Sequence, residues 1–304
     1  MRWIKKGFIY GPDGTMPWAK DTALTPTPIL LNQETIRVYA GFRDELWVSR
    51  IGFVDVDSAS PQVIKRVSSH PALDIGNNGA FDDNGVILGD VIRVNNEIRM
   101  YYVGFQLVSK VKFLAFSGLA ISKDGGDTFT RSSHAPLMDR ANDSLFIRAI
   151  HSVVKIGDQF HIWYASGNGW ETINGMSYPQ YHIRHAVSDD GIHIKTDSGV
   201  SVDVEGLEYR IGRPRVFQLN NKFYMHYTRG TTDGQYLAGL AESFDGIHWK
   251  RMDSALGISP SESGWDSKHL SYPALLSTEN KTYMFYNGND MGKQGFGYAE
   301  LESE

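Results

Sequence analysis

Acidic residues in a few loops are the first candidates for chemistry in this sequence. Asp82 and Asp83 lie in GAFDDNGV, Glu208 lies in GLEYRIGRPRV, and Asp44 follows the apolar run IRVYAGFR. Two carboxyl groups that flank one bond can cleave a glycosidic linkage, one as proton donor and one as base or nucleophile. We expect Asp83 to be the base or nucleophile and Glu208 the donor, with Asp82 and Asp44 as alternatives. A donor at neutral pH needs a raised pKa, which we expect partial burial of Glu208 to provide.

Basic and aromatic residues in the corresponding segments are candidates for binding the substrate. Arg43, Arg148 and Arg213 would hold an anionic part of it, such as a phosphate or a sugar carboxylate. The remaining candidates for contacts with a sugar are Trp170, Asp266, Tyr272 and His151. The competing interpretation of any single acid is that it is solvated or caps a turn.

Composition excludes several classes of protein. The chain has 304 residues with 30 Lys+Arg, 35 Asp+Glu and no cysteine, which excludes disulfides, thiolate metal sites and cysteine nucleophiles. A net charge of -5 disfavours nucleic acid as the main partner. No P-loop, dinucleotide fingerprint or HExxH metal motif is present, so we expect no cofactor and no metal. No apolar stretch suits a leader or a membrane span, and we expect a cytoplasmic protein.

An internal repeat indicates which elements position these residues. Five aromatic runs with strand-like alternation can be aligned on tyrosines that are 63, 62, 63 and 59 residues apart. The aligned tyrosines are Tyr39, Tyr102, Tyr164, Tyr227 and Tyr286. Each run follows another apolar strand across a short polar turn and leads to a third strand of small and apolar residues. In three of the units, an Asp-Gly turn then leads to a fourth strand.

Five repeated four-stranded meanders predict an all-β protein, a five-bladed β-propeller. We expect a single domain over 1–304, with the segment 4–10 as the missing fourth strand of the last blade. Two β-sandwiches are the alternative, but they do not explain the period. In a propeller the first strand of each blade lines the axis, and the loops that lead into these strands converge. The Asp-Gly hairpin 122–129 and its two counterparts match a turn motif that we expect to be structural.

The loops FDDNGV and EYRIGRPRV, the S-x-D-G hairpins and the final WDS…YP…YMFYNGN…GFGYA resemble the five-bladed glycoside hydrolase superfamily. That superfamily contains arabinanases, β-xylosidases, invertases and fructosyltransferases. The sequence is most similar to furanosidase-like proteins found with bacterial surface-polysaccharide genes. The resemblance implies three acids in an axial funnel. Glu208 matches the acid and Asp83 or Asp82 the second aspartate, while Asp21, Asp44 or Asp266 would supply the third.

Three hypotheses about function follow. The first is an enzyme that acts on a glycosidic or activated-sugar bond, with a carbohydrate or nucleotide sugar as substrate and a role in cell-surface polysaccharide metabolism. A sugar transferase or cyclase on the same scaffold is a variant of it. The second is a carbohydrate-binding propeller without catalysis, because propellers host many functions. The third is a platform for protein interactions, which would need a broad apolar patch instead of a funnel of acids.

Overall fold

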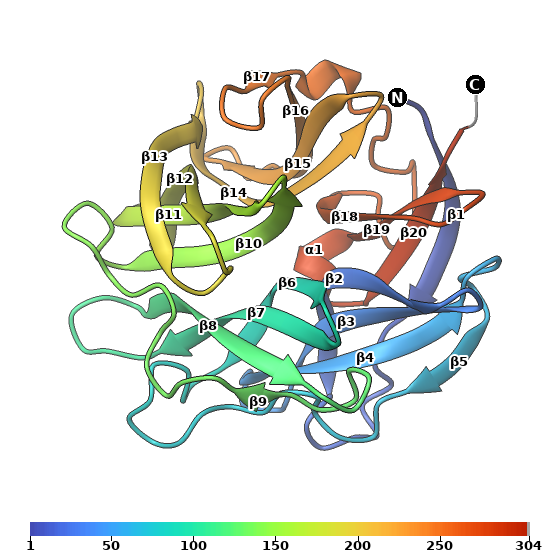
Figure 1. Cartoon of the computed structure of the whole chain (residues 1–304), viewed down its shortest axis with the longest axis horizontal. Coiled ribbons are helices and arrows are strands. Elements are labelled where there is room, and N and C mark those ends of the chain that lie inside the picture. Colours follow the sequence, from blue (N-terminus) through green and yellow to red (C-terminus); the bar gives the residue numbers. More distant parts are fainter. Residues whose placement is uncertain (303–304) are drawn as a thin grey trace.

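The computed structural model describes residues 1–302 and is built almost entirely of β-strands. Consecutive antiparallel strands pair into groups of four, each a meander. Figure 1 shows the groups arranged around a common centre. The first strands of neighbouring groups contact one another in a complete circuit, from β2 to β6, β10, β14, β18 and back to β2. The fold is therefore all-β and propeller-like.

The strand bounds follow the sequence repeat closely. The first group is β2 (Asp21–Asn32), β3 (Thr35–Arg43), β4 (Ser49–Asp57) and β5 (Ile64–Val67). The second is β6 (Val86–Val94), β7 (Glu97–Gln106), β8 (Leu114–Ser122) and β9 (Thr130–Arg131). The third is β10 (Ile147–Ile156), β11 (Gln159–Ile173), β12 (Met176–Ser188) and β13 (Ile194–Val202). The fourth is β14 (Glu208–Leu219), β15 (Lys222–Thr231), β16 (Tyr236–Ser243) and β17 (Lys250–Arg251). The fifth is β18 (Ser271–Ser277), β19 (Thr282–Asn287), β20 (Phe296–Leu301) and β1 (Trp3–Tyr10).

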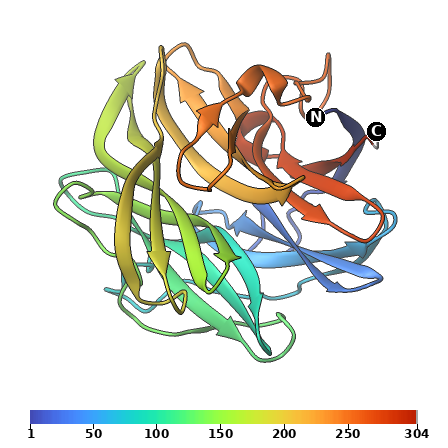
Figure 2. The same ribbon diagram turned by 45° about the horizontal axis from the view of Figure 1, so that its top comes forward.

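The two ends of the chain meet in the fifth group. As the sequence predicts, β1 supplies the missing fourth strand and pairs antiparallel with β20, and Figure 2 shows the termini close together. This pairing joins the two ends of the chain in one sheet, with β1 as its outer strand. A helical turn, α1 (Asn289–Gly292), lies between β19 and β20.

The repeated tyrosines form buried hydrogen bonds, four of them within their own group and one, from Tyr39, to the carbonyl oxygen of Gly126 in the second group. All five are buried, and four of them donate a hydrogen bond to an aspartate. Tyr102 donates to Asp82 over 3.0 Å, and Tyr286 donates to Asp266 over 2.9 Å. A buried hydroxyl without a partner is costly, so each aspartate satisfies a repeating structural need. The 62-residue period therefore reflects a repeated core contact.

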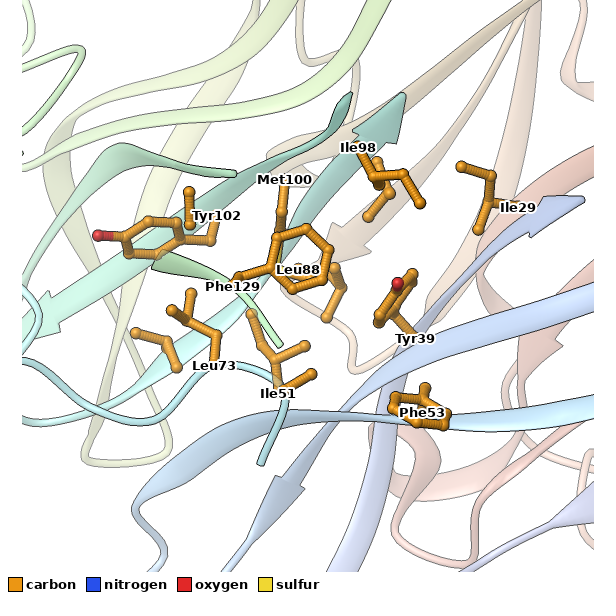
Figure 3. Packing of buried hydrophobic residues seen from close by; sticks show 14 of the residues in the cluster. Ile29, Tyr39, Ile51, Phe53, Leu73, Leu88, Ile98, Met100, Tyr102 and Phe129 are labelled. Atoms are coloured by element: carbon orange, nitrogen blue, oxygen red, sulfur yellow. The ribbon is translucent and has the colours of Figure 1, made fainter. Parts of the chain in front are cut away.

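Apolar residues fill the space between neighbouring groups. Figure 3 shows one such cluster, in which Tyr39 and Phe53 of the first group face Leu88 and Met100 of the second. The aromatic side chain of Phe129 completes this cluster, with its ring 5.6 Å from that of Tyr39. Burial of alternate strand residues on both faces explains why the aromatic runs read as strands in the sequence.

The Asp-Gly hairpins are structural, as expected. In the first, Asp124 accepts hydrogen bonds from the amide and hydroxyl of Thr128. In the other two, Asp190 and Asp245 accept hydrogen bonds from the amides two and three residues further on. These carboxylates cap their own turns, which is the common role of aspartate in tight turns.

Candidate functional site

Every first strand contains a β-bulge at the same place, where it faces the centre. An extra residue or pair interrupts the pairing of first and second strands at 25–26, 89, 151, 213–214 and 272–273. Bulges redirect side chains and are common next to active sites. Thr25, His151, Arg213 and Tyr272 occupy four of these positions, and all of them line one cavity. At the fifth, a Cβ on Gly89 would lie 2.2 Å from the carbonyl oxygen of Ile150, so only glycine fits.

This central cavity has a volume of about 600 Å³ and is bordered by all five groups of strands. A second cavity of about 490 Å³ adjoins it and shares Arg43, Trp47, Arg210 and Met291 as lining residues. Volumes of this size suit a small-molecule ligand. We call the end of the molecule at which these cavities open the mouth, and the opposite end, with the turns between first and second strands, the far end.

The central cavity is lined by cations and contains no carboxylate among the described residues. Arg43, Lys112, Arg210 and Arg213 line it, and Asp290 is the single acidic residue that lines the adjoining cavity. Most other arginines of the described chain form ion pairs, such as Arg37 with Asp55 and Asp127. Arg43, Arg210 and Arg213 instead contact aromatic rings, with Arg210 4.6 Å from the ring centre of Tyr236. The cavity is therefore electropositive although the protein carries net negative charge.

Arg213 is the most deeply buried of these cations. Burial and the neighbouring Arg215 lower its pKa to about 9. The carboxylate of Asp90 is bound by Arg215, so Arg213 donates only to the carbonyl oxygen of Leu88 and to Nδ1 of His151, 3.0 Å away. A buried charge without a counter-ion is costly. An anion in the cavity would supply the missing partner.

His151 completes the donor set. Burial, with Arg213 and Arg215, holds its pKa well below the ordinary value, so the ring is neutral at pH 7. Because the guanidinium of Arg213 donates to Nδ1, that nitrogen must carry the lone pair and the proton sits on Nε2. His151 is thus a neutral hydrogen-bond donor with a fixed tautomer, and it adds no charge to the arginines that line the cavity.

None of the four acids expected to be catalytic lines either cavity. Asp82 is fully buried and forms an ion pair with Arg131. Asp83 accepts a hydrogen bond from the amide of Gly79, and Asp44 binds Arg50 and caps its own loop. Asp82, four residues before β6, also accepts a hydrogen bond from the buried Tyr102, a structural use that the sequence does not reveal. The expected acid pair is therefore not observed in the cavity.

Glu208 differs from the expectation in its pKa as well as its position. Burial alone would raise the pKa, but hydrogen bonds from Arg251 and Arg229 outweigh that effect and lower it. The prediction of a raised pKa is wrong because two cationic side chains contact Glu208 and stabilise its ionised form. A carboxylate held ionised in this way is a poor proton donor at neutral pH.

The expected substrate-binding residues divide into two sets. Arg43, His151, Arg213 and Tyr272 come together in the central cavity. The remaining three do not line it. Trp170 packs against Phe113, with ring centres 5.0 Å apart, and Arg148 donates to the carbonyl oxygen of Asp139. Asp266 binds Lys5 and Tyr286 at the outer side of the fifth group.

Several lining residues were missed because they lie on other loops. Trp47 and Lys112 come from the connections between second and third strands, whereas Tyr178 and Tyr236 lie near the starts of the third strands β12 and β16. In a meander these connections end on the same side as the loops that lead into the first strands. The alternation of strand direction in the sequence repeat could have identified them.

Strained backbone marks the same region. Within the described range 1–302, eleven non-glycine residues have a positive φ, of which four are asparagines that tolerate it. The other seven all line the two cavities. They are Thr22, Thr25, Trp47, Arg213, Tyr272, Asp290 and Met291. Such strain costs about 1–3 kcal/mol per residue and concentrates at functional sites.

Two further observations concern metal sites and membrane helices in the described residues 1–302. No group of three or more His, Asp or Glu side chains is arranged there to hold a metal ion. Within the same range, no helix has the length and apolar character needed to cross a bilayer.

Comparisons with other proteins give a family and a fold. No family model matches the chain. The chain is 32% identical over 305 residues to "Uncharacterized protein Rv1502" of Mycobacterium tuberculosis strain H37Rv, covering 100% of both chains. "Uncharacterized protein MT1551" of strain CDC 1551 matches at the same identity and coverage.

Solved structures of glycoside hydrolases share the fold at low identity. One described as "Glycoside hydrolase" is 16% identical with a TM-score of 0.76, covering 99% of this chain and 92% of that one. A thermostable family-43 glycoside hydrolase is 18% identical with a TM-score of 0.70, covering 95% and 92%. A structure from the GH130 family of mannoside phosphorylases is 14% identical with a TM-score of 0.69, covering 99% and 93%. The expected likeness to propeller glycoside hydrolases is therefore confirmed at the level of the fold.

Proposed function

Because the chain belongs to the family of the M. tuberculosis protein Rv1502 and has the fold of glycoside hydrolases, we propose that it binds an anionic carbohydrate in its central cavity. The observation that carries this proposal is the set of three arginines, Arg43, Arg210 and Arg213, which line the cavity without a carboxylate partner. Sugar phosphates, nucleotide sugars and sugar acids all present the charge that these groups lack. Such ligands occur in the metabolism of surface polysaccharides.

The architecture supports a ligand at the axis. Five groups of four strands and the circuit of contacts between first strands support an interpretation as five blades, with β1 as the closing strand. Five bulges then direct one residue from each blade toward the hub. Tyr236 and Tyr272, whose hydroxyl groups are 2.8 Å apart, add neutral hydrogen-bonding groups beside the arginines. The arrangement suits recognition of an anionic group with several oxygens.

Calorimetric titration tests this proposal with glucose 1-phosphate, UDP-glucose, glucuronate and glucose as probes. We expect at least one anionic probe to bind and glucose to bind far more weakly. Arg213→Met should weaken that binding about 30-fold or more, the loss of roughly 2 kcal/mol expected for a charge-assisted contact. Arg93→Met is the matched control, because Arg93 is exposed on β6 and lies outside both cavities. Equal binding of glucose and the anions, unaffected by Arg213→Met, would contradict the proposal.

Hydrolysis by an acid pair remains a second candidate because one carboxylate oxygen of Asp83 is buried without a hydrogen-bond partner. This residue lies next to Asn84 and Gly85, which line the central cavity. Turnover of aryl glycosides or nucleotide sugars by the wild-type protein, lost in both Asp83→Asn and Glu208→Gln, would support it. Binding without turnover would favour a carbohydrate-binding role.

A further inference from the structure

Loops between second and third strands form the rim of the mouth, and most of them expose an apolar side chain there. Leu46 and Trp47 lie between β3 and β4, Leu107 between β7 and β8, Met176 at the tip of the β11–β12 hairpin, and Met291 between β19 and β20. Their exposed fractions are 78%, 58%, 63%, 57% and 41%, so these side chains contribute little to the core of the protein. The remaining loop, 232–235, is polar. We call these five side chains the apolar rim.

The apolar rim adjoins the arginines that line the two cavities. Trp47 and Met291 line both cavities together with Arg43 and Arg210. The guanidinium of Arg43 lies 5.2 Å from the ring centre of Trp47, so charge and apolar surface meet at that point. Both rim residues also have left-handed backbone, with φ of 65° for Trp47 and 55° for Met291. The fold holds these apolar side chains at the mouth despite the strain.

A tip of the long β11–β12 hairpin extends the same surface. Strand β11 continues to Ile173, and the chain then turns through Asn174 and Gly175, both with positive φ. Ile173, Asn174 and Met176 line the adjoining cavity. This extension therefore lengthens the site outward from the arginines.

We propose that the apolar rim binds the hydrocarbon chain of an amphiphilic anionic glycoconjugate, a lipid-linked sugar phosphate, whose anionic group lies against the arginines. The inference rests on the proposed function and specifies its ligand. In such a molecule the hydrocarbon chain is attached to the anionic group, just as the apolar rim adjoins the arginines that line the cavities. Exposed apolar surface beside a binding site commonly marks part of that site.

Charge and burial argue against two other occupants of the apolar rim. A second copy docked mouth to mouth would bring two sets of unpaired arginines face to face, which is unfavourable. The headgroups of an anionic membrane surface would not reach Arg210 and Arg213, which are only 8% and 6% exposed. A ligand that supplies both an anion and a chain meets neither difficulty.

Calorimetric titration with inorganic phosphate and octyl phosphate separates the two parts of the ligand. We expect octyl phosphate to bind about 100-fold more tightly, the gain from burying roughly three or four methylene groups. The double variant Leu46→Ser/Met176→Ser should remove about 10-fold of that gain and leave phosphate binding unchanged. Phe244→Ser is the matched control, because Phe244 is 76% exposed at the far end, beside Lys222.

The outcomes distinguish failure of this inference from failure of the proposed function. If phosphate and octyl phosphate bind equally, the apolar rim does not hold a chain and the inference is overturned while the anion site stands. If neither these probes nor the anionic sugars bind, the proposed function itself fails. UDP that binds more tightly than octyl phosphate would assign the rim to a nucleobase. Sedimentation with phosphatidylcholine vesicles in the absence of ligand would assign it to membrane contact; both results overturn the inference.

Discussion

The mouth and the far end of the molecule use left-handed backbone in opposite ways. At the far end, Asn95, Gly157, Asn220 and Asn221 form turns between first and second strands. These residue types adopt positive φ at low cost. At the mouth, threonine, tryptophan, arginine, tyrosine, aspartate and methionine adopt the same conformation. The far end is therefore built for stability, whereas the mouth maintains strain that stability alone does not explain.

The same contrast holds for charge. Within the groups of strands, arginines are matched with carboxylates, as in the cluster of Arg251 with Glu208 and Asp253. At the mouth, Arg43, Arg210 and Arg213 have aromatic neighbours and no ion pair among the described residues. Cations that the protein leaves unmatched are available to a ligand, and those that it matches maintain the fold.

The largest effect should come from removing a matched arginine. Arg251→Met would leave Glu208, whose side chain is 3% exposed, without its main partner, so we expect the free energy of unfolding to fall by about 3–5 kcal/mol. Arg213→Met removes a buried cation that has no carboxylate partner, and we expect a change below about 1 kcal/mol. Urea unfolding of both variants measures the difference. Equal losses would show that the two arginines serve the same structural purpose.

Two buried histidines, His151 in the central cavity and His226 outside it, should make the stability of the protein depend on pH. Burial lowers the pKa of His226 to about 3 and holds that of His151 well below normal. The unfolded chain binds protons at these residues near pH 6.5 and the folded chain does not, so stability should fall as pH drops below about 6.5. Each histidine contributes at most about 1.4 kcal/mol per pH unit.

Substitution of each histidine in turn measures how much of this pH dependence comes from each region. His226→Leu and His151→Gln should both flatten the dependence of the unfolding free energy between pH 6.5 and 5. Only His151→Gln should also weaken binding of the anionic probes, because His226 lies against Trp3 and Phe217, away from the cavities. Loss of anion binding in His226→Leu would remove the distinction between the two regions.

The smallest effect concerns backbone strain itself. Met291→Gly should raise the free energy of unfolding by about 1 kcal/mol, because glycine adopts a positive φ without a steric penalty. Asn220→Gly at the far end should change it by no more than about 0.3 kcal/mol, since asparagine already tolerates the conformation. Thermal unfolding of the two variants provides the comparison. A destabilised Met291→Gly protein would mean that side-chain contacts outweigh the strain.

Prediction from the sequence succeeded where a local pattern repeats. Alternating aromatic residues and polar turns located the strands, and the Asp-Gly motifs were correctly identified as structural. Among the site residues, His151, Arg213 and Tyr272 reach the cavity because they lie at the bulges of first strands. Arg43 reaches it from the end of β3. Asp82 and Asp266 do not line the cavity, and each accepts a hydrogen bond from a buried tyrosine hydroxyl on the adjacent strand.

The sequence by itself determined the strands and their order, because side-chain alternation and turn chemistry act over a few residues. Only the tertiary structure decided which charges are matched. An ion pair such as that of Arg215 with Asp90 joins residues 125 positions apart, and its presence leaves Arg213 without a partner. Electrostatic pairing depends on distance in space, and linear spacing does not reveal it.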